Sequence, residues 1–116
     1  MAADCVLVLT TLETEEDAVA LAREILQSRL AACIQLRRVR SLFPWEGEIR
    51  DGYEWLLVAK TPRRAFANLA EFIRIRHGYA LPEIIQVPIS DGSADYLRWL
   101  DGAVYDDKPP GASSNH

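Results

Sequence analysis

Three side chains in this sequence are of types that bind divalent metal ions: the imidazole of His77, the carboxylate of Glu83 and the thiol of Cys33. His77 stands at the end of a helical segment, where it can bind a metal or make a charge contact with the last helix carbonyls. Glu83 can face a cleft between subunits as an oxygen ligand, or pair with Lys60 across a sheet. Cys33 can bind a soft metal, although a cysteine in an apolar strand is typical of a core. Lys60 and Tyr79 are candidates for lining such a cleft.

Signatures of catalysis are nearly absent from the sequence. It contains only two histidines, one of them in the C-terminal tail, and spacing indicates no relay partner for His77. There is no Gly-rich phosphate loop of the Walker or Gly-x-Gly-x-x-Gly type. Acylphosphatases place a basic loop after their first strand, whereas residues 11–16 are acidic where a phosphate would have to sit. We therefore predict that the chain is not an enzyme and uses no organic cofactor.

Aromatic and basic side chains are concentrated in the middle of the chain. Trp45, Tyr53 and Trp55 can stack on a planar ligand, but aromatic residues on an extended ribbon more often anchor a subunit interface. Three arginines within residues 37–40 form the only dense basic run. That run can bind an anion or nucleic acid, or it can be solvated or paired with acidic groups at an interface.

Composition limits the class of protein. The 116 residues fit one domain, since domains commonly have about 100–150 residues. A net charge of −4 argues against nucleic acid and anionic membranes as partners. The two cysteines are too few for a disulfide framework, and no secretion signal or membrane-spanning run is present, so we expect a cytoplasmic protein. We predict one domain over residues 1–105 and a disordered tail over residues 106–116.

Hydrophobic patterning predicts an α+β fold. Apolar, β-rich runs predict strands at residues 5–11, 32–45, 53–60 and 84–89. Helical spacing predicts helices that begin after the cap residues Thr14 and Ser93, and a further helix that begins with Pro62 in its first turn and ends near residue 77. The order is a ferredoxin-like βαββαβ antiparallel sheet with helices on one face, plus a C-terminal helix. The long central ribbon would extend beyond the core and leave apolar area for a second subunit.

Four segments together carry a family resemblance: residues 29–34 (RLAACI), 45–49 (WEGEI), 56–61 (LLVAKT) and 77–84 (HGYALPEI). Together they resemble the CutA divalent-cation-tolerance family, and residues 96–100 (YLRWL) resemble the last helix of that family. The resemblance implies a ferredoxin-like homotrimer in which the long ribbons pair across subunits. It also implies a cytoplasmic, non-enzymatic role linked to copper and other divalent cations.

The same topology and trimeric form are similar to those of the PII signal-transduction regulators. By that analogy, the alternative function is a trimeric signalling or scaffold protein that binds a small anion or a protein partner at its subunit clefts.

The sequence departs from the copper site of the family. In members for which copper ligation is described, a cysteine ends the first strand and a His-His pair precedes a Pro-Tyr step. Here these places hold Thr10, Arg76 and His77, with Gly78 where proline is usual. A threonine hydroxyl and a guanidinium that keeps its proton do not replace nitrogen and sulfur ligands of copper. Only His77 carries over from that site.

Overall fold

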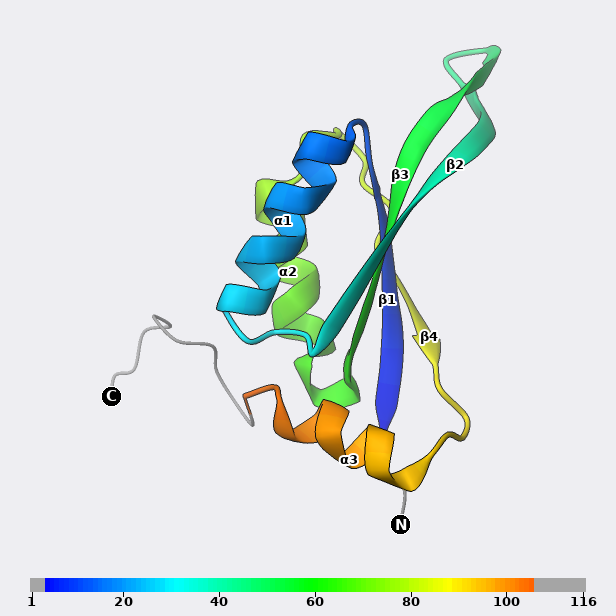
Figure 1. Cartoon of the computed structure of the whole chain (residues 1–116). Helices are drawn as coiled ribbons and strands as arrows, with labels where there is room; N and C mark the ends of the chain where they lie inside the picture. Colours follow the sequence, from blue (N-terminus) through cyan, green and yellow to red (C-terminus); the bar gives the residue numbers. More distant parts are fainter. Residues whose placement is uncertain (1–3, 106–116) are drawn as a thin grey trace.

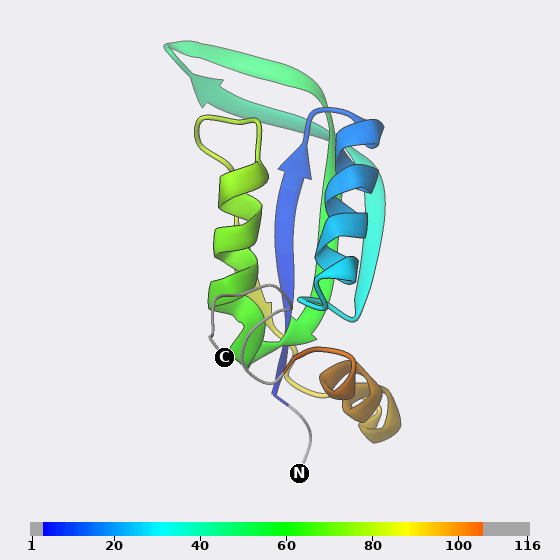
Figure 2. The same ribbon diagram turned by 90° about the vertical axis from the view of Figure 1, so that its left-hand side faces the viewer.

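The structure, a computed structural model, describes residues 4–105 as a four-stranded antiparallel sheet with three α-helices (Figure 1). In chain order the elements are β1 (Cys5–Leu12), α1 (Glu15–Gln27), β2 (Cys33–Trp45), β3 (Glu48–Pro62), a 3₁₀ turn (Arg63–Ala65), α2 (Phe66–Arg76), β4 (Ile85–Pro88) and α3 (Ala94–Gly102). The strand order is β2-β3-β1-β4, and α1 and α2 lie side by side over one face (Figure 2). The α+β fold class is confirmed.

Local signals place the helix starts. The hydroxyl of Thr14 accepts a hydrogen bond from the Asp17 amide at 3.0 Å, and the first turn of α1 carries three acidic residues that complement the helix dipole. Ser93 caps α3 in the same way, through the amide of Tyr96. Pro62 does not begin the second helix as predicted, because it is the last residue of β3 and is followed by the 3₁₀ turn. Its fixed φ suits the extended backbone found there as well as it suits a helix.

The main core cluster takes only one side of β1, β2 and β3. Residues that lie opposite each other in a ladder point to the same face, so the register assigns every side chain to a face. All strand residues of the main core cluster belong to the helix-covered face: Val6, Val8, Leu12, Ile34, Leu36, Trp55, Leu57 and Ala59. The helices complete this cluster with Leu21, Ile25, Leu69 and Ile73 among others.

The opposite face of the sheet is also apolar, although α1 and α2 do not cover it. Its apolar residues lie on β1, β3 and β4: Leu7, Leu9, Leu56, Val58, Ile85 and Val87. Toward β2 the same face carries Gln35, Arg37 and Lys60. We call this the open face. Of these residues, Ile85 is 48% exposed and Val87 is 40% exposed. At one end of the sheet, α3 packs through Leu97 and Leu100 in a small second cluster with Cys5, Ala32 and Ile89.

The β2–β3 ribbon is long, as predicted, with 13 and 15 residues in its strands (Figure 1). Its far half extends beyond the core and turns at Gly47, where φ is +82°. Phe43 and Trp45 belong to the open-face side of the ribbon, and they are 43% and 40% exposed. The ribbon therefore offers apolar surface that its own subunit does not bury.

The sequence also predicted a C-terminal tail and the absence of a membrane-spanning run. The tail assigned to residues 106–116 lies outside the described residues. Within residues 4–105, no helix is long and apolar enough to cross a membrane.

Candidate functional site

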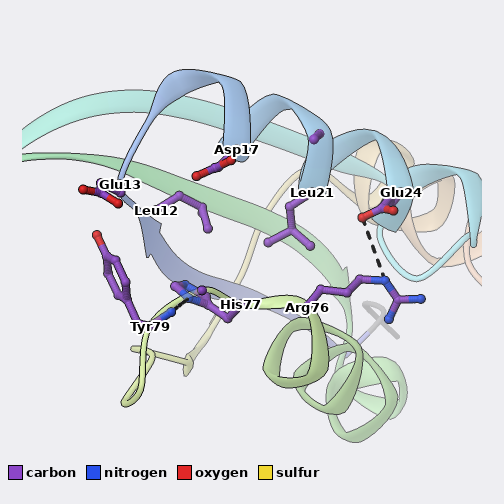
Figure 3. Close-up of a pocket in the computed structure, with 10 residues that line it drawn as sticks. Leu12, Glu13, Asp17, Leu21, Glu24, Arg76, His77 and Tyr79 are labelled. Atoms are coloured by element: carbon purple, nitrogen blue, oxygen red, sulfur yellow. Dashed lines mark hydrogen bonds and ion pairs between the residues drawn. The ribbon is translucent and has the colours of Figure 1, made fainter.

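A pocket of about 260 Å³ lies where the end of β1, the helix α1 and the end of α2 meet (Figure 3). One wall comes from α1, whose lining residues Asp17, Ala20, Leu21 and Glu24 recur at helical spacing and so share one face. The other residues that line it are Leu12, Glu13, Arg76, His77, Gly78 and Tyr79. The pocket thus includes His77, the principal candidate ligand, and Tyr79.

Both ring nitrogens of His77 are engaged inside the subunit. Its Nε2 lies 2.7 Å from the carbonyl oxygen of Thr11, and its Nδ1 accepts a hydrogen bond from the amide of Tyr79 at 3.1 Å. A carbonyl can only accept and a backbone amide can only donate, so Nε2 carries the proton and Nδ1 supplies its lone pair. The imidazole thus contacts a carbonyl of β1, and not the last carbonyls of α2 as one of the two sequence interpretations expected.

Tyr79 is held at three points. Besides its amide bond to His77, its ring lies 4.8 Å from the imidazole centroid, and its hydroxyl donates to the Glu54 carboxylate at 2.8 Å. Burial and the neighbouring Glu54 carboxylate raise the pKa of the Tyr79 phenol above its ordinary value. The loop after α2 is therefore fastened both to β1 and to the base of the ribbon.

The pocket has an excess of negative charge. Glu13, Asp17 and Glu24 line it, while the one guanidinium, that of Arg76, lies 3.8 Å from Glu24 (Figure 3). Arg76 also covers the ring of Phe72 at 3.5 Å. Such a surface favours cations over anions. The sequence interpretation missed these carboxylates, although the helical spacing of Asp17 and Glu24 was a signal that they share a face.

Cys33 is far from His77 within one subunit. Cys33 lies opposite Lys60, which lies opposite Leu7, whereas His77 contacts Thr11. Thr11 is four residues further along β1 than Leu7, which is about 13 Å at the usual strand rise. One ion cannot bind both side chains in the same subunit.

The remaining candidate ligand, Glu83, is an exposed residue of the loop before β4. Among residues 4–105 no ion pair joins it to Lys60, whose ammonium instead lies 5.7 Å from the ring centroid of Tyr96. No three His, Cys, Asp or Glu side chains of the described chain come together to hold a metal ion. A complete metal site is therefore not preformed in the described part of one subunit.

The three positions that the resemblance aligns with copper ligands lie on β1 and at the end of α2. Thr10 lies two residues before the end of β1 on the helix-covered side, Arg76 is the last residue of α2, and the next residue, His77, contacts the Thr11 carbonyl of β1. Thr10 is fully buried, and its hydroxyl has no hydrogen-bond partner among the described residues. Of these three residues, only His77 is of a type that ligates copper.

The ribbon aromatics divide between the two faces. Trp45 belongs to the open-face side, whereas Tyr53 and Trp55 belong to the helix-covered side. Trp55 packs against the core of its own subunit, and Tyr53 remains 56% exposed beneath the guanidinium of Arg38, which lies 3.9 Å from its ring centroid. Of these three rings, Trp45 presents apolar area to the side on which a second subunit can pack.

The basic run has partners within the ribbon. Arg40 makes two hydrogen bonds to Asp51, at 2.8 and 2.7 Å, and this pairing lowers the pKa of the Asp51 carboxyl. Together with the Arg38 contact to Tyr53, these bonds account for two of the three arginines. They are therefore poor evidence for a nucleic-acid or anion patch.

Comparisons of the sequence and of the structure with known proteins match this chain to the same family. Residues 6–103 match the family described as CutA1 divalent ion tolerance protein. A divalent-cation tolerance protein CutA from Thermus thermophilus is 39% identical over 80% of this chain and 91% of its own length. A CutA homologue from Danio rerio is 42% identical over 86% of this chain and 67% of its own length. The solved structure of a periplasmic divalent cation tolerance protein CutA from Archaeoglobus fulgidus superposes with a TM-score of 0.85 at 31% identity, covering 87% of this chain and 99% of that one.

Proposed function

The chain belongs to the CutA1 divalent ion tolerance protein family, and from this premise we propose that it acts as a homotrimer in the tolerance of, or response to, divalent cations such as copper. The module binds and responds, and it carries out no reaction. The observation that carries the proposal is the open face, a second apolar sheet surface that α1 and α2 do not cover and on which Ile85 and Val87 are exposed.

The open face calls for a partner for a physical reason. Antiparallel sheets with helices on one face usually carry polar side chains on the other, where water meets the sheet. Here the alternate residues of the central strand are Leu7 and Leu9, and those of the edge strand are Ile85 and Val87. Self-association through this face buries them and continues onto the ribbon at Trp45.

The cation part of the proposal centres on His77. It supplies the one imidazole at a negatively charged pocket, an environment that attracts divalent cations. Because residues 4–105 of one subunit do not bring together a full set of donors, we propose that binding is weak or takes a further donor, Glu83 or Cys33, from a neighbouring subunit. The register supports this for Cys33, which belongs to the open-face side and is only half-buried.

A cytoplasmic location is part of the same proposal. Both cysteines of the described chain are free thiols, which suits a reducing compartment. Cys5 is buried, and its burial raises the pKa of that thiol, so it is suited to a structural and not a reactive role.

The test is calorimetric titration of tag-free protein with Cu²⁺, comparing wild type with His77→Gln. Glutamine can still donate to the Thr11 carbonyl but lacks the imidazole, so the variant isolates ligation from folding. We expect saturable uptake that is lost in the variant. Uptake that is equal in both proteins would place the cation elsewhere, and the absence of uptake in both would remove the cation-binding part.

A second candidate is the PII-like signalling or scaffold protein, with an anion or a partner at the subunit clefts. Arg37 supports it, since this residue is exposed, belongs to the open-face side, and has no ion pair among the described residues. A ligand that binds only the native state must raise its melting temperature. A panel of nucleotides and anionic metabolites that leaves the melting temperature unchanged would count against this candidate.

A further inference from the structure

The availability of His77 to a cation is limited by its own hydrogen bonds. A metal ion needs a lone pair on a ring nitrogen. The lone pair of Nδ1 is occupied by the Tyr79 amide, and Nε2 carries the proton that it donates to the Thr11 carbonyl. If that proton moved to Nδ1, the Tyr79 N–H would face a protonated nitrogen, and the Thr11 carbonyl oxygen would face the lone pair of Nε2. Both hydrogen bonds would be lost. With the loop in place, neither nitrogen is open to a cation.

Tyr79 is the residue that keeps the loop in place. Its amide occupies Nδ1, its ring stacks at a tilt of 51° on the imidazole, and its hydroxyl is bonded to Glu54 on β3. Glu54 lies opposite Val39 on the ribbon, just beyond the end of the pairing with β1 at Leu12 and Trp55. The phenol therefore connects the imidazole to the base of the ribbon, which is a candidate assembly surface.

We propose that Tyr79 gates His77: a divalent cation gains the Nδ1 lone pair only when the Tyr79 amide withdraws, and this withdrawal also loosens the bond between the Tyr79 hydroxyl and Glu54. This inference rests on the proposed binding of a cation at His77. Tyr79 then has a positioning role. In response to the cation, the loop over residues 77–84 rearranges, and this rearrangement is transmitted to the ribbon. The chemistry selects borderline cations that accept imidazole nitrogen, such as Cu²⁺ and Zn²⁺.

The strength of the hydrogen bond between the Tyr79 hydroxyl and the Glu54 carboxylate determines how much the apparent affinity for a cation should change. A hydrogen bond to a charged group contributes about 1.5–3 kcal/mol, and each 1.4 kcal/mol is about tenfold in an equilibrium constant. Because Tyr79 is only partly buried, the lower end of that range applies. Removal of the hydroxyl should thus favour the open loop, and raise the apparent affinity of His77 for a cation, by about tenfold.

The experiment measures Zn²⁺ binding by calorimetry and the hydrogen exchange of the Tyr79 amide by NMR. The test variant is Tyr79→Phe, which leaves His77 and the backbone unchanged. Tyr53→Phe is the matched control, because it makes the same change on an exposed tyrosine whose hydroxyl has no hydrogen-bond partner among the described residues. His77→Gln identifies the uptake that depends on the imidazole.

The expected result is weak Zn²⁺ uptake by wild type and Tyr53→Phe, uptake about tenfold tighter by Tyr79→Phe, and an amide at position 79 that exchanges slowly without Zn²⁺ and faster with it. Zn²⁺ uptake that depends on His77, with equal affinity in all three proteins and an amide that stays protected, would overturn the gate and leave the proposed cation binding intact. Uptake by neither wild type nor Tyr79→Phe would reject the cation binding itself and the gate with it.

Discussion

Replacement of Val87 by aspartate should separate the subunits without unfolding them. Val87 lies on β4 in the open face and is 40% exposed in the subunit, so its outward side chain has room for a carboxylate. Full burial of a valine contributes about 1.5–3 kcal/mol, so burial of the exposed two-fifths contributes about 0.6–1.2 kcal/mol per subunit. Val87→Asp loses this contribution and adds the penalty of an unpaired buried carboxylate, several kcal/mol in proteins.

The assay is sedimentation velocity together with far-UV circular dichroism. We expect Val87→Asp to sediment as a folded species near the chain mass of 13.1 kDa, while wild type sediments as a trimer. Ile75→Asp is the matched control, because Ile75 is 62% exposed on α2, away from the open face. If Val87→Asp stays trimeric, or if Ile75→Asp dissociates equally, the open face is not the surface through which the subunits assemble.

Three further predictions concern the subunit. Leu57→Ala, at a fully buried core position, should lower the free energy of unfolding by about 2–5 kcal/mol in urea titrations; a loss below about 1 kcal/mol would contradict its place in the core. Thr61→Val should lower it by about 1–3 kcal/mol, because the buried threonine hydroxyl donates to the Leu30 carbonyl at 2.8 Å; an unchanged urea midpoint would argue against that bond. The pKa of the Tyr79 phenol is raised above its ordinary value of 10.0, so its contribution to stability is present below pH 10 and is lost as the pH rises toward the higher pKa of the folded state. Between pH 9 and 11 the free energy of unfolding should therefore depend more strongly on pH in wild type than in Tyr79→Phe. Equal slopes would mean that the bond to Glu54 is not formed.

Much of the fold was predictable because its signals are local. The unbroken apolar run of β1 indicated a central strand, and the strand order places β1 between β3 and β4. Thr14 and Ser93 marked helix starts through hydrogen bonds that span three residues. Pro62 was assigned wrongly because its fixed φ is compatible with both the end of a strand and the first turn of a helix.

The site was predictable only in part because its contacts are long-range. His77 was identified as the sole candidate imidazole of the folded part, but its bond to Thr11 joins residues 66 positions apart, and the bond from Tyr79 to Glu54 joins residues 25 positions apart. No local pattern encodes either distance. The open face was likewise hidden, since an apolar run shows that both sides of a strand are apolar but not which side the helices cover.

Native mass spectrometry of the wild-type chain with and without added Cu²⁺ tests assembly and cation binding together, because one spectrum reports both the oligomer mass and the metal uptake. We expect a trimer, at three times the chain mass of 13.1 kDa, that gains copper on titration and loses that gain in His77→Gln. A monomer would contradict the role of the open face, and a trimer that takes up no copper would contradict the role of His77.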